Sequence, residues 1–412
     1  MAGEDIAMVG PSRTWTARAT SVAAIEAELA RIWGAAARES REAHLSAQGM
    51  ATALGDPRLA GRLDVAGDVG VRMRTSVLTL IAIAERPETE ERVLGAIGAL
   101  AARHPSRTIV LSPGDPDGPA RLDAHIFAEC RIAGRGGAET CTEQILVRTG
   151  GEFDQHLSAL VQPLLIHDLP VLLWWPDDPP FGHPRFNGLI GSCDRLLVDS
   201  TTFRDEGAGL AAMAGLCART GAAVYDIGWM RLTRWRDLLA SVFDHPGLAP
   251  ELAGVRSLHI DVLSQGERLR ASKAALFAGW LAAVLGWQVA APLTATAGPD
   301  ALSGAFSHGR RRIPVEIGPA IRSGDQGHAA PGSLLRVEIG LAHRGDDVTA
   351  VMTRHLDHLL ATAHRSGVEV ARRVGRLEPR GDPQYLAAAL EQAGPDRMLA
   401  RSLALAVGLL GG

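Results

Sequence analysis

The chain has 412 residues, and its 42 lysine and arginine side chains against 46 aspartate and glutamate side chains give a formal net charge of -4. This balance argues against a general nucleic-acid binder, which normally carries a basic excess. Lys273 is the one lysine and no glycine run precedes it, so we exclude phosphate-loop NTPases, protein kinases and enzymes that form a lysine Schiff base.

Composition and length indicate an ordinary globular protein of two or three domains, because 46% of the residues are hydrophobic and 21% are charged. Four cysteines without CxxC spacing, in a long chain that lacks a signal-peptide pattern, predict reduced thiols in a cytoplasmic protein. Residues 274–299 carry no charge, but Gly286, Gln288 and Pro292 interrupt them. We therefore expect a buried helix there and no membrane span.

Residues 1–55 predict an N-terminal helical extension and linker. Apolar side chains recur near helical spacing within residues 15–44, which predicts an amphipathic helix. Glycine and aspartate are frequent in residues 49–70, which is typical of a loop.

Residues 56–228 alternate predicted strands and helices. Residues 77–84 form a near-continuous apolar run, as expected of a strand buried on both faces. The alternation predicts an α/β domain with a mostly parallel sheet covered by helices. The further predicted strands are residues 108–111, 125–132, 142–148, 169–175 and 194–198, and the predicted helices are residues 88–104, 153–165 and 207–220.

Residues 229–412 change to a period of two, in which apolar side chains alternate with polar ones. Such strands have one wet face and are typical of antiparallel sheets, so we expect an α+β C-terminal domain with antiparallel strands. The predicted strands are residues 258–262, 313–317, 335–341 and 348–354, and the predicted helices are residues 272–285, 383–393 and 397–409.

An ordered set of short segments between residues 75 and 285 resembles the OpcA family of glucose-6-phosphate dehydrogenase assembly proteins. The resemblance weakens toward the C-terminus. The segments are His104-Pro105-Ser106-Arg107, Cys141-Thr142-Glu143-Gln144-Ile145, Pro163-Leu164-Leu165, the run from Asp168 to Pro176, the run from Asp194 to Ser200, the run from Trp229 to Arg236, and Ala278-Gly279-Trp280-Leu281-Ala282.

The resemblance implies a non-catalytic protein without a cofactor that promotes assembly or activation of glucose-6-phosphate dehydrogenase. In cyanobacterial relatives this role is linked to thioredoxin control. All four cysteines of this chain lie between Cys130 and Cys217. A C-terminal cysteine switch is therefore not available here, which argues against thioredoxin as a partner.

The loop after the predicted strand 169–175 is the first candidate partner surface. The candidate contacts are Trp174 and Trp175 at the end of that strand, and Asp177, Asp178 and Phe181 in the loop, which prolines stiffen. Open α/β sheets place ligands at the carboxyl ends of their strands, and aromatic side chains beside charges suit an interface. The alternative is that both tryptophans are in the core and the loop is an inert turn.

Two further clusters contain arginine. Arg231 and Trp235 are four residues apart, so on one helix they share a face and can stack, either at a partner surface or where two domains are held together. Arg310, Arg311 and Arg312 precede a predicted strand and suit a phosphate group or an acidic partner surface, although a solvated turn also explains them.

Histidine and cysteine offer weaker candidates. His355, His358 and His364 lie close together, but no glutamate completes a zincin pattern, so we predict no metal site. Cys130 and Cys141 fall on successive predicted strands and are either a redox pair or two buried thiols.

No nucleophile elbow, dinucleotide fingerprint or metal motif is present, so we assign no catalytic residue. The sequence favours a cytoplasmic factor that binds glucose-6-phosphate dehydrogenase, promotes its active oligomer and supports the oxidative pentose phosphate pathway. The alternative is a binding protein for a sugar phosphate or nucleotide, or a sugar-phosphate enzyme, that uses the crevice at the strand carboxyl ends. The sequence leaves the oligomeric state open.

Overall fold

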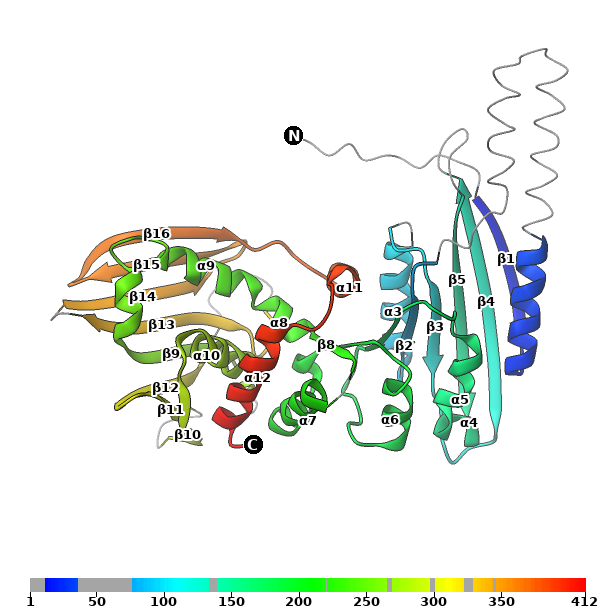
Figure 1. Cartoon of the computed structure of the whole chain (residues 1–412), viewed down its shortest axis with the longest axis horizontal. Coiled ribbons are helices and arrows are strands. Elements are labelled where there is room, and N and C mark those ends of the chain that lie inside the picture. The colour runs from blue at the N-terminus through cyan, green and yellow to red at the C-terminus, as the bar shows by residue number, and fades with distance from the viewer. Residues whose placement is uncertain are drawn as a thin grey trace, which may run out of the picture. The chain divides into compact units, whose positions relative to one another are not determined.

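The computed structural model describes residues 12–35, 76–101, 103–132, 139–219, 221–264, 269–296, 301–321, 329–343 and 346–412. The chain divides into two compact units, and each contains a sheet (Figure 1). The first unit comprises residues 1–176 and 183–194, and the second comprises residues 177–182 and 195–412. The domain limits expected from the sequence, 1–55, 56–228 and 229–412, remain a prediction.

The first unit contains the strand order β1-β4-β5-β3-β2-β6. Its elements are β1 (Ser12–Ala19), β2 (Thr79–Ile83), α3 (Pro87–Leu100), β3 (Arg107–Ser112), β4 (Arg121–Ile132), β5 (Glu139–Gly150), α4 (Glu152–Gln155), α5 (Leu157–Val161), the 3-10 turn Gln162–Leu164, β6 (Val171–Trp175) and α6 (Pro184–Ile190).

This sheet is mixed, and the mostly parallel arrangement predicted from the sequence is confirmed in part. The central pairs β5-β3, β3-β2 and β2-β6 are parallel, but β4 pairs antiparallel with both β5 and β1. The burial of β2 and β6 is continuous, while β4 alternates buried and partly exposed residues. That alternation is the pattern of an antiparallel strand with one wet face, and it marks β4 and β5 as a long hairpin.

Two predicted helices of the first unit were placed wrongly. Residues 12–19 form β1, and the helix begins only at Val22, after Ser21 accepts a hydrogen bond from the Ala24 amide at 3.2 Å. The part of the prediction beyond residue 35 lies outside the described residues. The predicted helix 153–165 is interrupted at His156, whose backbone leaves the helical conformation, so it forms α4, α5 and a 3-10 turn.

The second unit begins with the parallel pair β7 (Arg195–Val198) and β8 (Ala223–Asp226), and it also contains an eight-stranded sheet of order β10-β11-β12-β9-β13-β14-β15-β16. Its other elements are the 3-10 turn Ser200–Thr202, α7 (Glu206–Arg219), α8 (Ile227–Arg231), α9 (Thr233–Phe243), the 3-10 turn Ala249–Gly254, β9 (Val255–Leu263), α10 (Ser272–Leu285), β10 (Gln288–Ala295), β11 (Leu302–His308), β12 (Arg311–Ala320), β13 (Leu334–His343), β14 (Asp346–Arg354), β15 (His358–Arg365), β16 (Val368–Arg376), α11 (Asp382–Glu391) and α12 (Arg397–Leu410).

The eight-stranded sheet is antiparallel except between β12 and β9, which run parallel. The chain passes through α10 between these two strands, and such a crossover allows them to run in the same direction. Helix α10 packs on β9 and on α12, and α9 packs on β15 and β16 (Figure 1). The apolar segment 274–285 is a buried helix as predicted. None of the described helices is long and apolar enough to cross a membrane.

Candidate functional site

Two aspartates stand at the carboxyl ends of neighbouring strands in the second unit. Asp199 directly follows β7, and Asp226 is the last residue of β8. Since the two strands are parallel, their carboxyl ends lie at one edge, which is where α/β proteins usually place ligands.

Asp226 is the centre of this edge. Its carboxylate is fully buried and accepts four hydrogen bonds, from the amide and hydroxyl of Ser200 at 2.8 Å each and from the amides of Gly228 and Trp229 at 2.9 Å. It thereby caps the first turn of α8. Burial, and then the charge of Asp199, raise the pKa of Asp226 to about 6, although the hydrogen bonds favour its ionised form.

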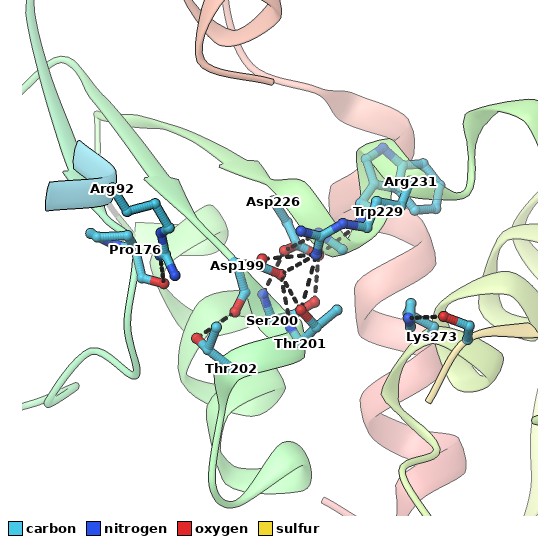
Figure 2. Close-up of polar contacts among 12 residues, drawn as sticks. Arg92, Pro176, Asp199, Ser200, Thr201, Thr202, Asp226, Trp229, Arg231 and Lys273 are labelled. Atoms are coloured by element: carbon cyan, nitrogen blue, oxygen red, sulfur yellow. Dashed lines mark hydrogen bonds and ion pairs between the residues drawn. The ribbon is translucent and has the colours of Figure 1, made fainter. Parts of the chain in front are cut away.

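Arg231 ties Asp199 to the same network. Its Nη1 donates to both carboxylate oxygens of Asp199 at 2.8 Å and to the Thr201 hydroxyl at 3.0 Å (Figure 2). Its guanidinium carbon also lies 5.3 Å from the ring centre of Tyr385 in α11. The cation therefore links the ends of β7 and α8 to the C-terminal part of the chain.

A cavity of about 180 Å³ opens beside Asp226 and is lined by residues of β8, α8, α9, α11 and α12. The indole of Trp229 forms one wall, and its Nε1 donates to the carboxylate of Asp396 at 2.8 Å. The guanidinium carbon of Arg236 lies 3.4 Å from the ring centre of Trp229. The indole ring of Trp229 is thus fixed by a hydrogen bond to Asp396 at its edge and by the guanidinium group of Arg236 on its face.

Lys273 is the second residue of α10 and is buried. Its Nζ donates to the Ser333 hydroxyl at 3.3 Å (Figure 2). Burial, reinforced by the charge of Arg231, lowers the pKa of Lys273 to about 8.

The first unit also has a cavity, of about 630 Å³, at the carboxyl ends of β2, β3 and β5. Its charged lining is balanced: three glutamates face three arginines, namely Glu85, Glu90, Glu91, Arg86, Arg121 and Arg148. Glu90 is paired with Arg148. Burial is the largest single influence on Glu90 and works against its ionisation. The hydrogen bonds from Arg148 and Ser112 and the nearby positive charge together outweigh burial, so the pKa of Glu90 is lowered.

This crevice does not suit a dinucleotide. Helix N-termini bind pyrophosphate through free amides and a favourable dipole. The first turn of α3 instead begins with Pro87 and carries the acidic side chains of Glu88 and Glu90. Their charges would repel a phosphate at this helix end. This crevice therefore does not support the alternative prediction that the protein binds a nucleotide.

Trp174 and Trp175, the predicted aromatic contacts for a partner, are both 0% exposed. Trp175 packs against the ring of Phe186 at a centroid distance of 5.5 Å. A docking role for these two side chains was therefore wrong, because β6 is buried on both faces and its adjacent side chains point to opposite covered sides.

The loop that follows them is partly exposed. Asp177 is buried, whereas Asp178 accepts a hydrogen bond from the Arg204 amide at 3.2 Å with its side chain 28% exposed. Phe181 is half-buried and meets the ring of Phe203 edge to face. Asp178 and Phe181 thus keep an accessible surface and remain predicted contacts.

The predicted stack of Arg231 on Trp235 is also wrong. Leu232 separates α8 from α9, so the two side chains do not share one continuous helix face. Trp235 is buried in the second unit, and Arg236 instead stacks on Trp229. The one-residue break between the two helices therefore explains why the cation–aromatic pair forms between Arg236 and Trp229 and not between Arg231 and Trp235.

The arginine cluster lies at the hairpin between β11 and β12, where Gly309 has a φ of 60°. Arg310 and Arg312 are exposed, and Arg311 donates to the Ala253 carbonyl at 2.7 Å. The cluster is not part of the lining of the cavity beside Asp226. It remains a predicted partner surface.

Two of the three histidines belong to a strand, and His355 directly follows β14. His358 and His364 lie in β15, and the rings of His355 and His358 stack at a centroid distance of 4.7 Å. In the described part of the chain, no group of three or more histidine, cysteine or acidic side chains is arranged to hold a metal ion.

Cys130 and Cys141 face each other across β4 and β5 and form a disulfide, which corrects the expectation of reduced thiols for this pair. Cys193 and Cys217 are free. Burial raises the pKa of the Cys193 thiol to about 12 and that of the Cys217 thiol to about 11, so neither is a reactive thiolate at neutral pH.

Sequence reasoning missed Asp199, Asp226, Arg236, Tyr385 and Asp396. A usable signal was present for the first two, because each aspartate ends a short apolar run and precedes a helical turn. The others come from α9, α11 and the start of α12, and no local pattern indicates that these segments meet.

Comparison with known proteins identifies the family. A model described as the N-terminal domain of the glucose-6-phosphate dehydrogenase subunit matches residues 98–215, and one described as the C-terminal domain of that subunit matches residues 222–403. The chain belongs to the OpcA family. The resemblance stated from short segments is therefore confirmed, and the family match extends into the C-terminal part.

Curated OpcA relatives match over part of their length. A Nostoc punctiforme protein, whose name assigns it provisionally to the OxPP cycle as OpcA, is 30% identical over 192 residues, or 46% of this chain and 40% of the relative. The Synechocystis relative of the same name is 26% identical over 238 residues, or 58% of this chain and 49% of the relative. The matches thus span less than half of either relative.

Among solved structures, the aldose-aldose oxidoreductase of Caulobacter crescentus aligns over 81% of this chain and 97% of its own, with a TM-score of 0.43 and 11% identity. A likeness this remote carries no functional argument.

Proposed function

We propose that this chain is a non-catalytic factor that binds glucose-6-phosphate dehydrogenase and promotes its active oligomer. The observation that supports this most is that two family models of the OpcA type, both named for the glucose-6-phosphate dehydrogenase subunit, together extend over both compact units. In this role the chain supports the oxidative pentose phosphate pathway and its supply of NADPH, in the cytoplasm.

The site geometry agrees with a role in binding. The carboxylate oxygens of Asp226 accept amide and hydroxyl hydrogen bonds, and Asp199 is held by Arg231 and Thr201. Acids engaged in this way fix the positions of helices and are poorly placed to exchange protons with a substrate. The crevice of the first unit is lined by acids at the helix end where a nicotinamide dinucleotide would need amides.

The proposed mechanism is a shift of population. A factor that binds the assembled dehydrogenase more tightly than its separated subunits stabilises the assembly by mass action. Its effect then saturates with added factor, and it needs no turnover of its own.

Two regions that keep accessible surface are the proposed contacts. One is the Asp178–Phe181 loop, and the other is the hairpin of Arg310, Arg311 and Arg312, whose guanidinium groups suit an acidic protein surface. Reversing the charge of both exposed hairpin arginines, Arg310→Glu with Arg312→Glu, tests the second. Arg397→Glu, another exposed arginine of this unit, is the matched control.

The test is co-purification of the full chain with glucose-6-phosphate dehydrogenase, followed by dehydrogenase activity against added factor. We expect co-elution and a saturable rise in activity. We expect the double variant to need at least tenfold more factor for half the effect, and Arg397→Glu to match the wild type. If the two proteins elute apart and activity stays flat, the proposed function is wrong. If both variants match the wild type, only the hairpin contact is wrong.

A further inference from the structure

The cavity beside Asp226 contains a cation whose hydrogen-bonding capacity is not fully used. Arg236 lines it, and its Nη2 donates to the Thr233 hydroxyl at 3.1 Å. Its Nη1 is buried from solvent and has no hydrogen-bond partner among the residues that the structure describes. A buried guanidinium N–H without an acceptor is costly, so it marks a place where a ligand oxygen would be stabilised.

Arg236 remains a cation at neutral pH. Burial lowers its pKa to about 10, and the charges of Asp396 and Asp237 oppose that shift. Its guanidinium also lies against Trp229, so the group is held in one orientation. A fixed, charged and partly unpaired donor is better suited to recognise an anion than a mobile surface side chain.

Two carboxylates also line this cavity, and both are engaged by donors of the protein itself. Asp226 accepts four hydrogen bonds, as described above. Asp396 accepts from the Leu399 amide at 2.8 Å and from Trp229 Nε1 at 2.8 Å. These acids are held by donors of the protein, and the arginine and tyrosine side chains of the lining still offer donors to a ligand.

More positive charge gathers around Tyr385, which lines the same cavity. Burial raises the pKa of its hydroxyl, while the nearby charges of Arg231 and Arg380 oppose that rise. Arg380 itself lines the cavity and is exposed, so it can reach a ligand from the solvent side. The lining of the cavity thus contains one arginine with a buried guanidinium nitrogen, Arg236, and one exposed arginine, Arg380.

We propose that this cavity binds a phosphate-sized oxyanion, with Arg236 and Arg380 as its charged contacts and Tyr385 as a hydroxyl donor. Arginine forms paired hydrogen bonds with phosphate oxygens, which suits this arrangement. At about 180 Å³ the cavity is smaller than the 300 Å³ or more of typical drug-sized pockets, so it takes an ion or one phosphoryl group with little else enclosed. Inorganic phosphate and the phosphoryl group of a sugar phosphate share this chemistry.

The test is calorimetric titration of the full chain, at constant ionic strength, with inorganic phosphate, glucose 6-phosphate and glucose. We expect saturable binding of at least one phosphate-bearing probe and none of glucose. Tighter binding of glucose 6-phosphate would assign the site to the sugar phosphate, and equal binding would assign it to phosphate alone. The experiment needs no dehydrogenase, so its result is independent of the assembly role.

Variants locate the binding. Arg236→Gln and Arg380→Gln should each weaken binding about tenfold, the loss expected for one charge-assisted hydrogen bond. Arg234→Gln, an exposed arginine of the same helix as Arg236, should bind as the wild type does. Arg380 is exposed, so its replacement keeps the test valid if Arg236→Gln fails to fold. No saturable binding of either phosphate probe, equal binding by all variants, or binding of glucose as tight as that of its phosphate would overturn the proposal.

Discussion

Each compact unit places a cavity at the carboxyl ends of parallel strands, but the two cavities use their charges differently. In the first unit, Glu90 and Arg148 form an ion pair in which the arginine side chain is 40% exposed. In the second unit, Asp226 is fully buried and serves as the acceptor for two helical turns. The same topological position therefore holds a partly exposed ion pair in one unit and a buried hydrogen-bonded acceptor in the other.

The largest expected effect comes from removing the central acceptor of the second cavity. Asp226→Ala leaves four donors without their acceptor, so we expect the free energy of unfolding to fall by about 3–5 kcal/mol. Asp226→Asn keeps one acceptor oxygen and should lose less. Urea unfolding of the three proteins measures the difference, and a loss below about 1 kcal/mol for Asp226→Ala would contradict the framework role.

The same residue predicts a pH dependence. The pKa of Asp226 in the folded chain is about 6, above the ordinary aspartate value of 3.8, so the folded chain binds this proton more tightly than the unfolded chain does. The stability from this proton is complete below about pH 4 and is lost as the pH rises through 6, by roughly 3 kcal/mol. Asp226→Asn lacks the titrating group. As the pH rises from about 4 through 6, the unfolding free energy of the wild type should therefore fall relative to that of Asp226→Asn. Parallel profiles would show that Asp226 does not titrate there.

Two glycine substitutions contrast the packing around the cavities. A Cβ at Gly228 would meet the Ser200 hydroxyl oxygen at 2.2 Å, so Gly228→Ala should lower the unfolding free energy by about 1–3 kcal/mol. Gly95 lies within α3 and a Cβ there meets nothing within 4 Å. Gly95→Ala should therefore stabilise by about 0.5–1 kcal/mol. Thermal unfolding measures both effects. If the unfolding midpoints of both variants shift in the same direction, the expected difference in packing is wrong.

The smallest effect is expected at the crevice of the first unit. Glu90→Gln breaks its ion pair with Arg148, and we expect a loss of about 0.2–1 kcal/mol that shrinks as salt is added. Urea unfolding at two salt concentrations measures it. A loss as large as that of Asp226→Ala would mean that this crevice is as rigid as the other cavity.

The spacing of apolar residues along the sequence predicted the buried strands and helices well. It failed for segments whose secondary structure depends on contacts with distant parts of the chain. The apolar runs of β2 and β6 and the helix α10 were recognised because burial on every side leaves a clear compositional signal. Residues 12–19 carry alternation too weak to separate a strand from a helix, and their pairing with β4 decides the outcome. His358 and His364 were compared with the zincin pattern, which is helical, whereas cross-strand pairing with β14 and β16 places them in strand β15.

The candidate site could be predicted only in part. That a site lies at strand carboxyl ends follows from the alternation of strands and helices, but Trp174 and Trp175 are covered by their own unit. The cavity joins Asp226 and Arg236 to Tyr385 and Asp396, which are about 150 residues further along the chain. No spacing rule connects residues at that separation, and only the packing of α11 and α12 brings them together.

The central claim, that this chain promotes the active oligomer of glucose-6-phosphate dehydrogenase, is tested most directly by sedimentation velocity. The dehydrogenase is measured alone and with increasing amounts of this chain, at a concentration where its subunits are partly dissociated. We expect a larger species that contains both proteins and a falling fraction of free dehydrogenase subunits as the factor saturates. An unchanged distribution of the dehydrogenase, with this chain sedimenting separately, would contradict it.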